Sequence, residues 1–241
     1  MTAILAIARR ELAEFFATPV GWLCLTAFAA ISGFFFAMMC TEFSVQATTA
    51  AYNPYVAEQI NLNDWLIQPF FANTSVVLLM LSPALSMRLF AEDRKQKSLE
   101  LLLSSPISSG QIVLGKFFGV MAFVTVMLAT TLPLTALLYW LGRPDSGVLV
   151  SCYLSAWLLA ASFLSVGLLT SAMTENQIVA LVTGFGVLLI LWVLSWANAI
   201  AGPGLGDLLA GISMLSHIDQ LLKGLLHLKD VVYFLSFVGF F

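Results

Sequence analysis

Charged residues are scarce in this chain of 241 residues. It holds 10 lysines and arginines and 13 aspartates and glutamates, so charged residues make up 10% of the sequence and hydrophobic residues 60%. A soluble domain carries roughly 25% charged residues. The chain therefore cannot cover itself with a water-facing surface. This excludes a soluble globular protein and indicates an integral membrane protein.

Alternating strand patterns and processing signals are also missing. The apolar runs are continuous, whereas transmembrane β-strands alternate apolar and polar residues, so we predict an all-α membrane protein. The first 18 residues contain Glu11 and Glu14 and lack a small-x-small cleavage site, which argues against a signal peptide. The three cysteines, Cys24, Cys40 and Cys152, lack metal-ligand spacing. A bridge between Cys40 and Cys152 is conceivable, but apolar packing is the favoured interpretation.

Catalytic and nucleotide-binding motifs are absent as well. No Ser-His-Asp, Cys-His or H-E-x-x-H constellation occurs, and we predict a non-catalytic subunit without a metal or directly bound cofactor. Gly110 to Lys116 matches the start of a phosphate-binding loop, but Phe117 replaces the Ser or Thr that would hold magnesium. We interpret Lys116 as a cytoplasmic anchor. Gly115 and Gly119 would allow close approach of a neighbouring helix.

The long apolar runs, which we interpret below as membrane spans, contain no ionisable side chain well inside the bilayer. Such a residue would cost about 2.5–3.5 kcal/mol, and its absence disfavours an ion-driven secondary transporter. His217 and His227 lie ten residues apart, near Asp219 and Asp230. We interpret them as solvated interfacial residues, because a metal site needs a tighter cluster.

Runs of about 20 apolar residues predict the membrane spans. The transmembrane domain, 19–241, has predicted spans at 19–39, 70–90, 117–141, 148–172 and 178–200, and an incomplete one at 231–241. Because the sixth run is too short to span and ends without an interfacial anchor, we expect the chain to continue past Phe241.

The basic residues predict the orientation. With the N-terminus in the cytoplasm, seven of them lie inside and three outside, as the positive-inside rule requires. The inner set is Arg9, Arg10, Arg88, Arg94, Lys95, Lys97 and Lys116, and the outer set is Arg143, Lys223 and Lys229. The first outer loop, 40–69, contains acidic residues but no lysine or arginine.

Residues 1–18 predict an interfacial amphipathic helix. Six apolar residues fall within an arc of about 120°. These are Ile4, Leu5, Ala8, Leu12, Phe15 and Phe16. Arg10 and Glu14 occupy the far side as a weak i,i+4 pair, and Thr18-Pro19 ends the helix. A merely solvated helix is the alternative.

Two further segments carry functional hypotheses. Helix breakers at 202–206 precede apolar residues at helical spacing, so 201–229 is predicted to form one or two outer re-entrant helices. Four small polar residues in the predicted spans are candidates for lining a transport path between subunits: Asn73, Ser75, Ser82 and Thr131. Hydrogen bonding between helices explains these four at least as well.

The most informative segment is a charge island: 7 of the 23 charged residues lie between Arg88 and Glu100. It opens a predicted cytoplasmic coupling loop, 91–116. Within the loop, 98–104 is predicted to form a short helix with leucines on one face, and Ser108 to cap the next helix. A flat helix beneath the membrane is suited to docking a cytoplasmic protein.

The run S-L-E-L-L-L-S-S-P-I-S-S-G-Q-I-V-L-G-K at 98–116 resembles the cytoplasmic loop of ABC-2 type permeases. Ala8-Arg9-Arg10-Glu11-Leu12, followed by F-x-T-P, resembles their N-terminal interfacial helix. The resemblance covers essentially the whole chain and implies a six-span, type V exporter-like permease with outer re-entrant helices. Lys97-Ser98 stands where relatives often have Gly-Thr. The size and the outer loop are most similar to permeases associated with gliding motility.

The resemblance implies a permease subunit of the bacterial inner membrane, coupling ATP hydrolysis by a separate cytoplasmic ABC ATPase to export or to extracytoplasmic work. ATP and magnesium would bind that ATPase. Other implied partners are a second permease copy or paralogue, an extracytoplasmic accessory protein and lipid, but no nucleic acid. The implied ATPase-coupling residues are Glu92, Asp93, Arg94, Lys97, Ser98, Leu99, Glu100, Leu102 and Leu103. The alternative is a structural or mechanochemical subunit of a motility or envelope complex that moves no solute.

Overall fold

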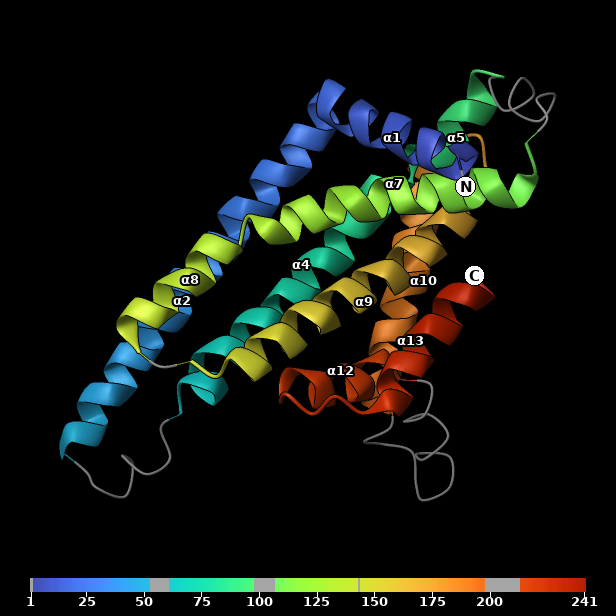
Figure 1. Ribbon diagram of the computed structural model, residues 1–241. Coiled ribbons are helices and arrows are strands. Elements are labelled where there is room, and N and C mark those ends of the chain that lie inside the picture. Colours follow the sequence, from blue (N-terminus) through green and yellow to red (C-terminus); the bar gives the residue numbers. More distant parts are fainter. Residues whose placement is uncertain (1, 53–60, 98–106, 143, 198–212) are drawn as a thin grey trace.

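The computed structural model describes residues 2–52, 61–97, 107–142, 144–197 and 213–241 (Figure 1). Throughout these ranges the secondary structure is helical, with no strand. In chain order the helices are α1 (Thr2–Ala17), α2 (Pro19–Tyr52), η1 (Asn63–Ile67), α4 (Gln68–Ser86), α5 (Arg88–Lys95), α7 (Ser109–Ala129), α8 (Leu132–Leu141), α9 (Ser146–Ala172), α10 (Gln177–Ala197), α12 (Met214–Leu222) and α13 (Leu228–Phe240).

Five helical stretches are long and apolar enough to cross a membrane. They are Pro19–Tyr52, Asn63–Lys95, Ser109–Trp140, Ser146–Ala172 and Gln177–Leu194. Each overlaps one of the five complete runs that the sequence predicts, and an all-helical membrane fold is therefore confirmed. The sixth span stays a prediction, because α13 has only 13 residues. The predicted re-entrant helices and the boundary between interfacial helix and transmembrane domain also stay predictions.

Helix α2 is longer than the first predicted span. It continues to Tyr52, into the segment predicted as the start of the first outer loop. Its 34 residues correspond to roughly 50 Å, well beyond a hydrocarbon core of about 30 Å. The reason is local: no proline interrupts the sequence between Pro19 and Pro54. Polarity after residue 40 thus marks the exit from the apolar layer rather than the end of the helix.

The second and third spans are each built from more than one helix. Met87 separates α4 from α5, and Thr130 with Thr131 separates α7 from α8. At the second break Pro133 enters the first turn of α8, and the Tyr153 hydroxyl of α9 lies 2.9 Å from the Thr131 hydroxyl. The predicted continuous run at 117–141 is therefore two helices held together by a tyrosine of the neighbouring span.

Helix α9 lies at the centre of the bundle (Figure 1). It contacts α4, α5, α7, α10, α12 and α13, and its residues from Leu158 to Leu168 are all buried. At one end, α12 lies across it: the Ser151 hydroxyl donates to the Leu221 carbonyl at 2.5 Å. Cys24, Cys40 and Cys152 are all free thiols, so the conceivable bridge between Cys40 and Cys152 is not formed.

Helix α1 packs against α7 (Figure 1), and its buried side differs from the apolar face read from the sequence. Ile7, Glu11 and Phe15 are buried, at i, i+4 and i+8, whereas Leu5 is 74% exposed. The predicted apolar arc therefore does not describe the side that faces the protein. Because Glu11 is one of these buried residues, a hydropathy pattern does not identify this side of the helix as buried.

Two glycines of α7 permit the close approach of α1. A Cβ added to Gly119 would lie 2.6 Å from the Cβ of Glu11 and 3.0 Å from the Ala8 carbonyl oxygen. One added to Gly115 would lie 2.7 Å from the Cβ of Ile7. The small-residue contact predicted for Gly115 and Gly119 is confirmed, and the neighbouring helix is α1.

We predict that Gly119→Ala lowers the free energy of unfolding by about 1–2 kcal/mol, because the added methyl group displaces α1 from α7. The measurement is denaturant unfolding of the purified chain in mixed micelles. Gly33→Ala in α2 is the matched control, since a Cβ there meets no atom within 4 Å. It should be neutral or raise stability by up to about 1 kcal/mol through helix propensity. Equal effects of both changes would contradict the packing argument.

Candidate functional site

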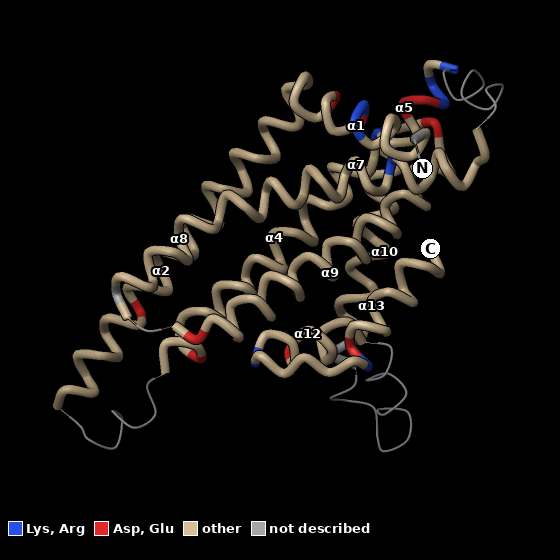
Figure 2. Tube along the Cα trace, in the orientation of Figure 1, with Lys and Arg blue, Asp and Glu red and all other residues tan. Residues whose placement is uncertain are grey.

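Charged residues gather at the two ends of the bundle and leave its middle apolar (Figure 2). The richer end carries α1, α5 and the start of α7. It contains the described part of the charge island, residues 88–97, and the N-terminal helix that precedes the first span. We refer to it as the charged end.

Lys116 joins three helices at the charged end. Its Nζ lies 2.6 Å from Glu11 Oε1 on α1 and 2.7 Å from Asp93 Oδ2 on α5. The side chains of Lys116, Glu11 and Asp93 are 2%, 5% and 13% exposed, respectively. The residue interpreted from sequence as a cytoplasmic anchor is the buried centre of an ion-pair cluster. We call Lys116, Glu11 and Asp93 the lysine cluster.

Two opposing effects act on the pKa of Glu11 in the lysine cluster. Burial raises the pKa of Glu11 above its usual value, and the attraction of Lys116 offsets only part of this shift. A buried ion pair gives little net stability, but removing one partner leaves a costly unpaired charge. The cluster is thus better suited to holding three helices in one arrangement than to adding stability.

Arg88 makes a second connection between the helices at this end. Its guanidinium donates to the Thr18 hydroxyl at 2.8 Å and lies over the Phe15 ring at 4.4 Å from its centroid. Phe15 lies in the last turn of α1, and Thr18 joins α1 to the first span. Arg88 therefore ties the beginning of α5 to this turn, independently of the lysine cluster.

Ser171 of α9 stabilises the break between α4 and α5. Its hydroxyl accepts hydrogen bonds from the Phe90 and Ala91 amides, both at 3.1 Å, and donates to the Met87 carbonyl at 2.9 Å. The backbone groups freed by the break are satisfied by a side chain of another helix. This geometry identifies residues 87–91 as a joint between the second span and the charged helix α5.

A polar cavity of about 350 Å³ lies beside the lysine cluster. Residues from α1, α5 and α7 and the turn after α1 line it: Arg10, Glu11, Glu14, Thr18, Arg88, Leu89, Glu92, Asp93, Gln96 and Lys116. Arg10 pairs with Glu14 at 3.2 Å, as the i,i+4 spacing predicts. Four carboxylates and three cations face this cavity, so its lining is slightly acidic.

The predicted coupling residues divide into three groups. Asp93 points inward to Lys116. Glu92 is half-buried at the polar cavity and accepts from Gln96 Nε2 at 3.1 Å, while Arg94 and Lys97 are exposed. The other five, Ser98, Leu99, Glu100, Leu102 and Leu103, lie outside the described residues, as does the predicted helix at 98–104. The predicted cap at Ser108 is confirmed, since its hydroxyl accepts from the Gln111 amide.

The four path-lining candidates do not lie together. Asn73 and Ser75 line a cavity of about 350 Å³ between α4, α10 and α12. The buried Ser82 hydroxyl donates to the Leu78 carbonyl, and Thr131 is bonded at the α7–α8 break. Among these candidates, Thr131 bonds to another helix, through the Tyr153 hydroxyl of α9, whereas the Ser75 and Ser82 hydroxyls donate to carbonyls of their own helix, α4. A path between subunits stays a prediction for all four.

Sequence reasoning missed a second ionisable pair, at the opposite end of the bundle. His217 Nδ1 of α12 lies 2.6 Å from Asp230 Oδ1 of α13, and Asp230 is fully buried. The His217 ring stacks on Tyr233, with centroids 4.1 Å apart. His217 is therefore not the solvated residue that the sequence indicated. The two residues are 13 positions apart on different helices, so no helical periodicity in the sequence predicts that they pair.

The ionisable residues do not converge on a metal site. In the described part of the chain, no group of three or more His, Cys, Asp or Glu residues could hold a metal ion. In the lysine cluster the charged groups pair with one another, and the cluster contains no paired nucleophile and base. The charged end can therefore hold helices together and offer charge to a partner.

A bundle of apolar helices with charged ends defines a multi-pass membrane protein. Residues 5–240 match the family described as ABC-2 family transporter protein, and the chain belongs to this family. A comparison with curated proteins gives no match. Members are membrane components of ABC transporters and are generally not catalytic. Membership implies association with an ABC ATPase.

Proposed function

We propose that the chain is a permease subunit that receives mechanical work from a separate cytoplasmic ABC ATPase at its charged end. The observation that carries the proposal is the lysine cluster, which joins α1, α5 and α7 through one buried ammonium group. A force applied to any of these helices is passed directly to the other two. The first, second and third spans all connect to this unit.

The joint at residues 87–91 gives the proposed force a structural route. Helix α5 meets α4 at Met87, whose amide bonds to the Pro83 carbonyl, while the Ser171 hydroxyl of α9 bonds to the Met87 carbonyl and to the Phe90 and Ala91 amides. In this proposal, a change of angle at the joint exchanges the hydrogen bonds that Ser171 makes. Coupling then requires that the ATPase bind the two arrangements of the joint with different free energies.

Within this proposal the coupling residues have different tasks. Glu92 and Lys97, with the segment 98–103, contact the ATPase. Asp93 acts internally, because it holds α5 to Lys116. ATP and magnesium bind the ATPase, and the N-terminus lies in the cytoplasm of a bacterial cell, as the distribution of basic residues favours.

We predict that Glu92→Lys weakens binding of the partner ATPase roughly tenfold or more, because it reverses a charge at the proposed contact without touching the lysine cluster. The ATPase is the hydrolase that co-purifies with the wild-type chain, titrated onto permease in nanodiscs. Glu42→Lys, an exposed reversal on α2 away from the charged end, is the control. Normal binding and normal stimulation of ATP hydrolysis by Glu92→Lys would show that this docking surface is wrong.

A second permease copy or paralogue completes the proposed transporter. The spans least covered by the rest of the chain are α10 and α2. On α10, a Cβ added to Gly186 would meet no atom within 4 Å, and small residues are common where membrane helices pack together. Subunit counting in native membranes distinguishes one chain from two, and a lone chain per complex would contradict the pairing.

The alternative function keeps the ATPase but moves no solute, as in a motility or envelope complex. An extracytoplasmic accessory protein fits both versions. Accumulation of a substrate in inverted vesicles containing permease and ATPase would favour transport. ATP hydrolysis without any flux would favour the mechanical version, and activity that persists without ATP would revive an ion-driven transporter.

A further inference from the structure

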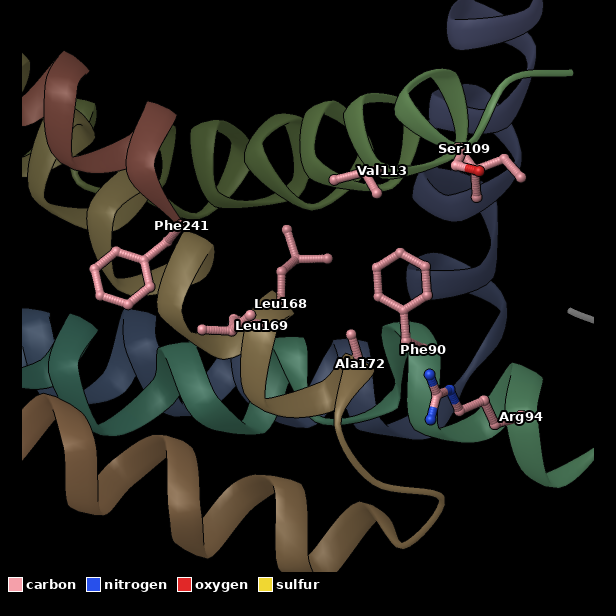
Figure 3. Close-up of a pocket in the computed structure, with 9 residues that line it drawn as sticks. Phe90, Arg94, Ser109, Val113, Leu168, Leu169, Ala172 and Phe241 are labelled. Atoms are coloured by element: carbon pink, nitrogen blue, oxygen red, sulfur yellow. The ribbon is translucent and has the colours of Figure 1, made fainter.

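An apolar cavity of about 280 Å³ opens at the charged end (Figure 3). It lies on a different side of α5 from the polar cavity, since Phe90 and Arg94 line it, whereas Leu89, Glu92 and Asp93 line the other. Its walls come from α5, α7 and α9 and from the end of the described chain at Phe241. Leu168 lies deep within it at 5% exposure, whereas Val113 on its rim is 45% exposed. Its volume approaches the roughly 300–1,000 Å³ of small-molecule sites.

Among the residues that the structure describes, Arg94 is the single charged one that lines this cavity. It lies at one end of the cavity with Ser109, and Phe241 lies at the other (Figure 3). Among the described residues no carboxylate pairs with Arg94, although α5 contains two acidic residues. Asp93 is turned inward to Lys116, and Glu92 faces the polar cavity. The described part of the apolar cavity therefore has a cation at its mouth and no side-chain carboxylate in its lining.

The two cavities differ in the charge they would accept. Four carboxylates face the polar cavity, and they would repel an anion. The apolar cavity combines hydrocarbon walls with an exposed guanidinium and a hydroxyl. Basic pockets beside membrane helices bind the headgroups of anionic lipids, and a guanidinium matches phosphate geometry.

We propose that this cavity binds one anionic phospholipid from the leaflet that meets the charged end, with an acyl chain between α7 and α9 and its phosphate on Arg94. The apolar walls accept any acyl chain, because lipid tails are as apolar as the side chains they replace. The preference for an anionic headgroup therefore comes from Arg94. The site requires no ATPase and does not depend on the proposed transport function.

The test uses the full chain, purified in detergent and mixed with equal amounts of phosphatidylglycerol and phosphatidylcholine that carry the same acyl chains. Native mass spectrometry counts the first lipid retained. We expect the wild type to prefer phosphatidylglycerol roughly fivefold or more, the effect of one basic residue near a membrane surface. Arg94→Gln should bring this preference close to one, and Arg94→Lys should keep part of it.

Two further variants separate a built site from general attraction. Lys95→Gln removes the neighbouring exposed charge, which does not line the cavity, and should leave the preference within twofold of the wild type. Val113→Trp obstructs the rim from an exposed position, so it should reduce retention of both lipids without unfolding the chain.

Three results would overturn the proposal. The first is a wild type without headgroup preference. The second is a loss with Lys95→Gln as large as that with Arg94→Gln, which would show diffuse attraction to the charge island. The third is unchanged retention by Val113→Trp, which would place the lipid elsewhere.

Discussion

Lys116→Met is expected to lower the free energy of unfolding by about 3–5 kcal/mol. Methionine preserves most of the side-chain volume, but it leaves the Glu11 and Asp93 carboxylates together in a buried site without their cation. Two like charges in this largely buried site repel each other, and α1 and α5 must move apart or one carboxylate must take up a proton. Denaturant unfolding in mixed micelles, with the wild type alongside, measures the change.

Neutralising the whole lysine cluster should reverse most of this loss. The triple variant Lys116→Met, Glu11→Gln, Asp93→Asn carries no buried charge, and it should regain more than half of the lost stability. Lys229→Met, which removes an exposed lysine of α13, is the control and should change stability by less than about 0.5 kcal/mol. A single Lys116→Met variant as stable as the wild type would refute the ion-pair argument.

His217→Ala is expected to destabilise the opposite end of the bundle by about 2–3 kcal/mol. The fully buried Asp230 would lose its 2.6 Å partner, and Tyr233 would lose the stacked ring. The expected loss is smaller than for Lys116 because the His217 side chain is 16% exposed, so water can reach part of the vacated site. Denaturant unfolding measures the global change, and limited proteolysis between α12 and α13 reports local opening.

The other histidine supplies the matched control for this prediction. His227 is exposed and makes no side-chain capping bond at the start of α13, so His227→Ala should have little effect. Asp230→Asn added to His217→Ala should recover part of the loss, because a neutral amide is less costly to bury than a carboxylate. Equal stability of the two alanine variants would show that the His217–Asp230 pair does not hold α12 and α13 together.

Several local features were predictable because they depend on residues close in sequence. Continuous apolar runs predict membrane helices, and these helices are present. Ser108 caps α7 because its hydroxyl needs to reach only Gln111, three residues away. The i,i+4 pair of Arg10 and Glu14 follows from helical geometry in the same way.

The candidate site was only partly predictable. The charge island identifies the correct end of the bundle, but not which of its charges face inward. Lys116 lies 105 residues from Glu11 in sequence, and no periodic pattern connects residues so far apart. The sequence also did not show which side of α1 is buried against α7, because hydropathy cannot distinguish a carboxylate facing water from one facing a buried lysine.

By itself, the sequence determined the membrane class, the five complete spans, the charged ends and the resemblance to ABC-2 permeases. These properties follow from composition and from local spacing. Only the tertiary structure showed that Asp93 pairs with Lys116, that Arg94 lines an apolar cavity and that His217 pairs with Asp230. The physical reason is that lipid and the protein interior are equally apolar. The sequence therefore indicates which residues are removed from water, but not which neighbouring helix each of them contacts.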